Sequence, residues 1–122
     1  MTGGQFHLGV VMDPIGSIHP EKDTTLLLLQ AAQRTGFRLT YFEISDIFAR
    51  NDGVWGWGRP LRVFERNEHF FEFGRDPKPL LLTDLSVLLM RKDPPVDLEY
   101  GYVTLLLALA EQAGLWIINS PQ

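Results

Sequence analysis

The chain has no cysteine, and this absence excludes disulfide bonds and thiolate metal sites. Its three histidines, His7, His19 and His69, lie far apart and do not have the spacing of a metal-binding motif. We therefore predict no metal site within this segment.

An excess of basic residues is also missing. The 122 residues contain 11 Lys and Arg against 15 Asp and Glu, which gives a formal net charge of -4. Such a chain has no positive field to attract a phosphate backbone, so we expect no nucleic-acid partner. No apolar run approaches the roughly 20 residues that a membrane span requires, so we expect no membrane partner. The first five residues lack the basic and apolar regions of a secretory signal, which favours a cytoplasmic location.

Two familiar glycine motifs for nucleotide binding are missing as well. No GxGxxG follows the first apolar run, and no GxxxxGK[ST] occurs in the sequence. If a nucleotide is used, another part of the polypeptide must hold it.

The first half of the sequence has the pattern of a βαβ unit. Its length suits one domain over residues 1–122. The apolar run that begins at Leu8 predicts a buried strand, and the side chains of residues 23–25 can cap a helix over Leu26–Arg34 that Gly36 ends. The aromatic and β-branched stretch Arg38–Ile44 predicts a second strand.

The second half begins with a predicted β-hairpin around the turn Asn51–Gly53. A third parallel strand is expected at 85–90, a helix at 97–113 and a last short strand at 116–118. Residues 67–73 have no clean period, and 74–79 are expected to form a loop before the leucines at 80–82. The core candidates of that helix are Tyr100, Val103, Thr104, Leu107 and Ala110. The predicted fold is a three-layer α/β domain with a doubly wound, mostly parallel sheet and a β-hairpin insertion.

Two segments share one design, a short apolar run that breaks into charge and proline: 8–14 and 87–95. Ligands of open α/β sheets bind outside the carboxyl ends of the strands. The residues at these two ends, Asp13, Arg91, Lys92 and Asp93, therefore mark a candidate small-molecule cleft.

Arg91 is the strongest single candidate because its planar guanidinium can grip a carboxylate with two hydrogen bonds. The alternative is that Arg91 pairs with Asp93 or Asp13 and has only a structural role. Side chains alternate along a strand, so Arg91 and Lys92 cannot both point into one pocket. The prolines that follow Asp93 either stiffen a binding turn or simply begin the next helix.

Four blocks of sequence carry a resemblance to a known family: Leu8–Ile15 (LGVVMDPI), Lys22–Thr25 (KDTT), Leu88–Asp97 (LLMRKDPPVD) and Ile118–Gln122 (INSPQ). In this order they resemble the N-terminal domain of bacterial glutathione synthetase. The resemblance implies a Rossmann-like pre-ATP-grasp domain of a ligase that joins γ-glutamylcysteine to glycine through an acyl phosphate. It also implies that ATP and Mg²⁺ are held by an ATP-grasp domain absent from this chain, that this fragment alone is inactive, and that the complete enzyme is a homo-oligomer.

Within this chain the resemblance implies a substrate-binding role and no catalytic one. The family pattern falls on Asp13, Pro14 and Ile15 in the first turn and on Arg91, Lys92 and Asp93, with Pro94 beside them, in the second. It makes Arg91 the anchor for a carboxylate of γ-glutamylcysteine or glutathione, and it makes Asp13 and Asp93 the groups that orient Arg91 or the substrate amine.

Two readings of other classes remain open. A free-standing flavodoxin-like module with a phosphorylated acidic pocket needs a pair of acids after the first strand, and only Asp13 is present there. An oligomerisation module would use the aromatic hairpin that holds Trp55 and Trp57. A hairpin whose alternate aromatics pack on the sheet is the commoner arrangement.

Overall fold

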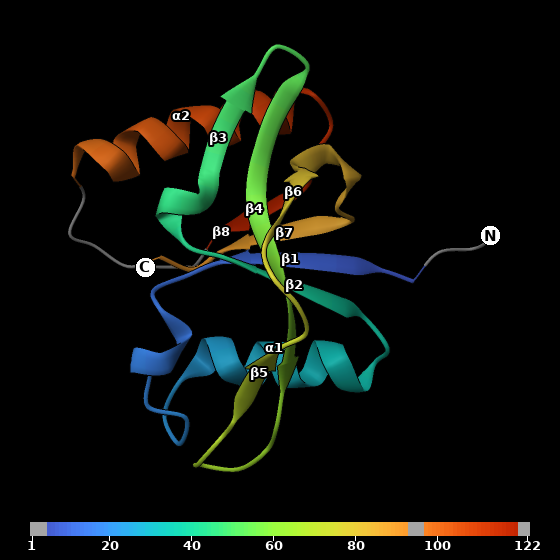
Figure 1. Ribbon diagram of the computed structural model, residues 1–122, viewed down its shortest axis with the longest axis vertical. Helices are drawn as coiled ribbons and strands as arrows, with labels where there is room; N and C mark the ends of the chain where they lie inside the picture. The colour runs from blue at the N-terminus through green and yellow to red at the C-terminus, as the bar shows by residue number, and fades with distance from the viewer. Residues whose placement is uncertain (1–4, 93–96, 120–122) are drawn as a thin grey trace.

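The computed structural model describes residues 5–92 and 97–119. A mixed sheet is covered on opposite faces by α1 (Thr24–Arg34) and α2 (Leu98–Gln112), as Figure 1 shows. The strands are β1 (His7–Val11), β2 (Arg38–Phe42), β3 (Ile47–Arg50), β4 (Gly53–Val63), β5 (Phe71–Phe73), β6 (Lys78–Leu81), β7 (Val87–Met90) and β8 (Ile117–Asn119). Three short 3-10 helices are η1 (Ile15–Ser17), η2 (Ile44–Asp46) and η3 (Leu82–Asp84). Neither α-helix of the described residues is long and apolar enough to cross a membrane.

The sheet has the order β3-β4-β2-β1-β7-β8, with β5 and β6 also paired to β4. The pairs β1–β2, β1–β7 and β7–β8 are parallel, as predicted, whereas every pair that β4 makes is antiparallel. The predicted hairpin is therefore present as β3–β4, but it is fused to the central sheet through β2. The sheet is mixed rather than mostly parallel for this reason.

Strand β4 is shared by four other strands. Its first half pairs with β3 and β6, and its second half pairs with β2 and β5. The short strands β5 and β6 were not predicted, because three or four residues at a sheet edge show little alternation. Their positions are determined by backbone pairing with β4.

The helices lie where the sequence predicts them, and α1 begins earlier than expected, at Thr24 rather than Leu26. The Asp23 side chain accepts a hydrogen bond from the backbone N–H of Leu26 (2.9 Å), and Asp97 accepts one from Tyr100 (2.8 Å), so both aspartates are N-caps. Gly36 and Gly114 follow the helices with φ of 100° and 116°, a conformation that glycine adopts without strain.

Two apolar clusters fill the space between the sheet and its helices. Alternate residues of β1 face opposite sides, so Leu8 and Val10 pack with α1 and Val11 packs with α2. The buried face of α2 consists of Val103, Leu106, Leu107 and Ala110. The predicted core residue Thr104 is exposed instead, and its hydroxyl donates to the Tyr100 carbonyl within the helix (2.8 Å). Tyr100 is half-buried, and Leu106 takes the place that Thr104 was expected to fill.

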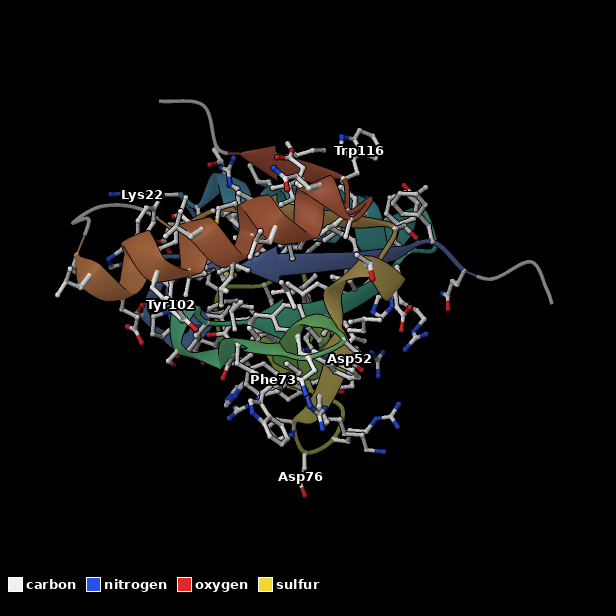
Figure 2. All side chains as sticks on the ribbon, turned by 90° about the horizontal axis from the view of Figure 1, so that it is seen from above. Lys22, Asp52, Phe73, Asp76, Tyr102 and Trp116 are labelled. Carbon is white, nitrogen blue, oxygen red and sulfur yellow. The ribbon has the colours of Figure 1, made fainter. Side chains whose placement is uncertain are left out.

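The outer face of α2 is apolar but exposed. Figure 2 labels Tyr102 on this helix and Trp116, which projects from the domain just before β8. The large apolar side chains exposed on α2 and around β8 are Leu98, Tyr102, Leu105, Leu109, Trp116 and Ile118. An apolar surface of this kind is typical of a contact with another protein segment.

The Phe42 ring occupies a space that three glycines leave open. A Cβ atom on Gly56 would lie 2.6 Å from the ring, and one on Gly58 or Gly9 would lie 3.1 Å from it. The glycine side of the hairpin therefore packs inward. Trp57 lies on its other side, 46% exposed and stacked near Phe48 (6.0 Å between ring centroids). Trp57 is exposed, so the expected packing of the alternate aromatic side chains against the sheet is not found at this residue.

This packing predicts opposite effects for two Gly→Ala changes. Gly56→Ala should lower the free energy of unfolding by about 1–3 kcal/mol, because the buried Phe42 ring has no room to move. Gly101→Ala, within α2 and with nothing within 4 Å of its Cβ, should raise it by about 0.5–1 kcal/mol. Urea denaturation of the two variants measures both. Equal effects of the two changes would contradict this account of the glycines.

A second prediction concerns acid stability. Burial and the nearby Arg38 charge lower the pKa of His7 below 6.5, and Asp84 opposes them in part. The unfolded chain then binds a proton that the folded chain does not, so stability falls as the pH drops below 6.5, by at most about 1.4 kcal/mol per pH unit for one group. His7→Gln should flatten this dependence between pH 7.5 and 5.5 in urea titrations. Identical slopes in both proteins would show that His7 is not responsible.

Candidate functional site

The parallel strands bring three chain segments to one edge of the sheet. Because β2, β1 and β7 run in the same direction, the residues that follow them lie at the same edge, and α1 also begins there (Figure 1). We use the term strand-end site for Asp13, Thr24, Thr25, Arg91 and Lys92.

Arg91 is held in place by both its backbone and its side chain. Its N–H donates to the Val11 carbonyl (2.8 Å), which extends the pairing of β1 and β7 by one residue. Met90 belongs to the α2 side of the core, so the alternation of side chains directs Arg91 toward α1. Its Nε donates to Thr25 Oγ1 (3.0 Å) and its Nη2 to Thr24 Oγ1 (3.1 Å).

The Arg91 charge is not neutralised by these contacts, because both acceptors are uncharged hydroxyls. Over residues 5–92 and 97–119, no carboxylate forms a salt bridge with Arg91. The guanidinium carries five N–H donors, and the two threonines use two of them. The alternative reading, in which Arg91 pairs with Asp13, is not what the structure has.

The first turn of α1 adds to this positive potential. Thr24 and Thr25 are its first two residues, and the N-terminus of a helix carries a partial positive charge. A cation and a helix N-terminus that lie together favour an anion between them. The Asp23 carboxylate offsets part of this potential because it caps the helix.

Asp13 pairs with Lys92 rather than with Arg91. The Lys92 Nζ lies 3.0 Å from Asp13 Oδ1, and the two side chains are 22% and 39% exposed. This ion pair joins the turn after β1 to the turn after β7. It agrees with the prediction that Arg91 and Lys92 point in different directions.

Pro14 and Ile15 form the turn itself. Pro14 is exposed, whereas the Ile15 side chain is buried in the core, so Ile15 can offer a ligand only its backbone. The Ile15 N–H donates to Tyr41 Oη (3.1 Å), and the Tyr41 hydroxyl donates to Glu43 Oε2 (2.6 Å). Burial and the hydrogen bond to Glu43 raise the pKa of Tyr41, so the phenol stays neutral and this link is retained at physiological pH.

Asp93 lies outside the described residues, as does Pro94. The threonines that hold Arg91 were not predicted as site residues, although the sequence does place them at the start of α1. The signal that could have found them is a pair of hydroxyls in the first turn of the helix that follows β1, because this turn lies at the carboxyl edge of the sheet.

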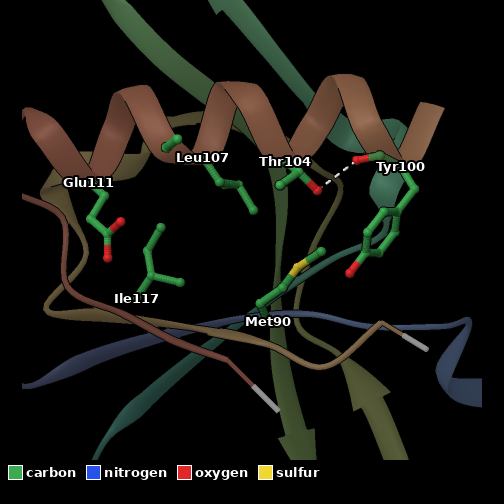
Figure 3. A pocket seen from close by; sticks show the side chains of 7 residues that line it. Met90, Tyr100, Thr104, Leu107, Glu111 and Ile117 are labelled. Carbon is green, nitrogen blue, oxygen red and sulfur yellow. Dashed lines mark hydrogen bonds between the residues drawn. The ribbon is translucent and has the colours of Figure 1, made fainter. Parts of the chain in front are cut away.

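A separate hollow of about 150 Å³ lies between α2 and strands β7 and β8 (Figure 3). Its lining includes Met90, Tyr100, Leu107, Glu111 and Ile117, and none of the strand-end residues borders it. In the part of the chain that the structure describes, no three His, Asp or Glu side chains are grouped closely enough to hold a metal ion.

Comparison with known proteins shows the family to which the chain belongs. The family described as prokaryotic glutathione synthetase, N-terminal domain, matches residues 6–122. Glutathione synthetase of Shewanella oneidensis is 46% identical over 115 residues, and those of Salmonella typhi and Escherichia coli K12 are 44% identical over 115 residues. Each match covers 94% of this chain and 36% of the relative, so the chain spans about a third of the length of these proteins. The chain belongs to the prokaryotic glutathione synthetase family and corresponds to its N-terminal domain.

Proposed function

We propose that this chain is the substrate-side domain of an ATP-dependent ligase that joins γ-glutamylcysteine to glycine, and that its strand-end site holds a carboxylate of the peptide. The observation that carries the proposal is the Arg91 guanidinium, which lies beside the N-terminus of α1 with only hydroxyl partners among the described residues. The names of the relatives, which are glutathione synthetases, supply the substrate class.

In this proposal Arg91 anchors a carboxylate of γ-glutamylcysteine or glutathione. The ion pair of Asp13 and Lys92 keeps the two turns together. Pro14 and the Ile15 backbone line the first turn, and Asp93 orients the substrate amine from the second. None of these residues is assigned a chemical step.

The chemistry belongs to a later ATP-grasp domain. There ATP would phosphorylate the cysteinyl carboxylate, and the glycine amine would displace phosphate from the acyl phosphate. The described residues do not fit a magnesium site, because they offer no cluster of carboxylate ligands. In this proposal ATP and Mg²⁺ are held by the later domain, and the fragment alone is inactive because it lacks that domain. The proposal also places the complete enzyme in the cytoplasm.

The exposed apolar face of α2 supports a contact with the rest of the ligase. Its exposed side chains include Leu105 and Leu109, and the relatives extend well beyond the length matched here. We propose that the ATP-grasp domain packs on this face and that the complete enzyme assembles as a homo-oligomer.

The proposal predicts a selective kinetic defect for Arg91→Ala in the complete ligase. The KM for γ-glutamylcysteine should rise about tenfold or more, because a charge-assisted hydrogen bond is lost, while the KM for ATP stays unchanged. Arg50→Ala, which removes an exposed arginine of the β3–β4 hairpin, is the matched control and should leave both constants unchanged. Equal KM values for the dipeptide in Arg91→Ala and the unaltered enzyme would refute the proposal.

Thr25 is proposed as a positioning residue for Arg91. Thr25→Val keeps the shape but removes the oxygen that accepts from Arg91 Nε. It should raise the dipeptide KM about fivefold, because one of the hydrogen bonds that position the guanidinium is lost. Thr25→Ser keeps the hydroxyl and should restore a KM close to the original value. If the serine variant has the same KM as the valine variant, the hydroxyl does not position Arg91.

A further inference from the structure

The opposite edge of the sheet carries an unassigned pocket of about 200 Å³. We use the term amino-edge pocket for the space bordered by nine residues: His7, Arg38, Thr40, Gly58, Pro60, Arg75, Lys78, Pro79 and Leu80. Three of these nine residues are cations, although the whole chain has a net charge of -4. The basic residues here are therefore concentrated against the overall charge.

The pocket is assembled by strand register. His7 is paired with Arg38 in β1–β2, and Gly58 is paired with Lys78 in β4–β6. Arg75 comes from the connection between β5 and β6. Thus the unpredicted strand β6 and its preceding connection bring two of the three cations to the amino ends of β1 and β2.

Among the described residues, the three cations of the pocket have no carboxylate partner. In the described part of the chain, no salt bridge involves Arg38, Arg75 or Lys78, whereas Arg34 pairs with Glu65 (2.6 Å) and Arg62 with Glu72 (3.4 Å). The negative charge of Asp84 partly offsets the effect of the Arg38 charge on the pKa of His7, which lies at the floor of the pocket. The net charge of the side chains around the pocket is therefore positive.

The floor of the pocket contains a buried polar group with spare hydrogen-bonding capacity. The His7 side chain is nine-tenths buried, and its Nε2 lies 2.6 Å from Thr40 Oγ1. Within residues 5–92 and 97–119, the other ring nitrogen, Nδ1, has no hydrogen-bond partner. When the Thr40 hydroxyl donates to Nε2, the neutral ring carries its proton on Nδ1, where it can donate to a ligand. A buried donor without a partner costs free energy, which an acceptor in the pocket removes.

We propose that the amino-edge pocket is a second binding site, for a small multivalent oxyanion of the phosphate class, either inorganic phosphate or a phosphomonoester. A guanidinium group can donate two parallel hydrogen bonds to the oxygens of a phosphate. Lys78 adds a third positive charge to those of Arg38 and Arg75, and the cavity has room for such an ion. The two ends of β1 are roughly 13 Å apart at about 3.3 Å per residue, so this site is distinct from the strand-end site. It does not depend on the function proposed above.

The test titrates the full 122-residue chain with inorganic phosphate and follows its backbone amides by NMR, with sodium chloride replaced so that ionic strength stays constant. We expect saturable shifts centred on His7, Arg38, Arg75 and Lys78. Arg38→Gln should raise the dissociation constant about tenfold, because one charge-assisted contact is lost. Arg50→Gln removes the same charge from the exposed hairpin and should leave the dissociation constant unchanged. Lys78→Gln removes an exposed cation of the pocket and should also weaken phosphate binding.

Three results would overturn the proposal. A separate titration with increasing sodium chloride and no phosphate could produce the same shifts, which would show general charge screening. Phosphate shifts could centre on Thr24, Thr25 and Arg91, which would place the anion at the strand-end site. Equal dissociation constants for Arg38→Gln, Lys78→Gln and Arg50→Gln would show that the pocket cations do not hold the ion.

Discussion

The parallel pairing of β1 with both β2 and β7 is the constraint on which the rest of this structure depends. It places the ends of three strands at one edge, and the hydrogen bond from Arg91 N–H to the Val11 carbonyl carries that alignment one residue beyond β7. The direction of the Arg91 side chain toward α1 then follows from the alternation of strand residues. The cation meets the start of α1 because this helix, which follows β1 after η1 and a loop, begins at the same edge of the sheet.

The fusion of the β3–β4 hairpin to the sheet has consequences for the core and for the amino-edge pocket. The glycines of β4 leave room for the Phe42 ring, so β4 lies close enough to pair with β2. The Phe42 ring lies on the side of the sheet that α2 covers. The same strand recruits β6, which supplies Lys78 to the amino-edge pocket. An element with no part in the strand-end site therefore shapes the second pocket.

Local features of this fold could be predicted from the sequence, and long-range ones could not. The cap at Asp23 and the turn before Gly53 depend on residues close together in the chain, and these predictions are confirmed. The strands β5 and β6 depend on pairing with a distant strand, so no local pattern marks them. Thr104 was wrongly predicted as a core residue because it lies beside the buried stripe of α2 rather than on it.

In the strand-end site too, local features could be predicted from the sequence and long-range contacts could not. Alternation along β7 correctly separated Arg91 from Lys92, but the partners of each depend on how α1 and the β1 turn are placed in space.

The central claim is that Arg91 binds a substrate carboxylate, and a crystal structure of the complete ligase with γ-glutamylcysteine tests it most directly. The account predicts a substrate carboxylate within hydrogen-bond distance of the Arg91 guanidinium. A bound dipeptide whose carboxylates are held elsewhere, with Arg91 still bonded only to Thr24 and Thr25, would contradict it.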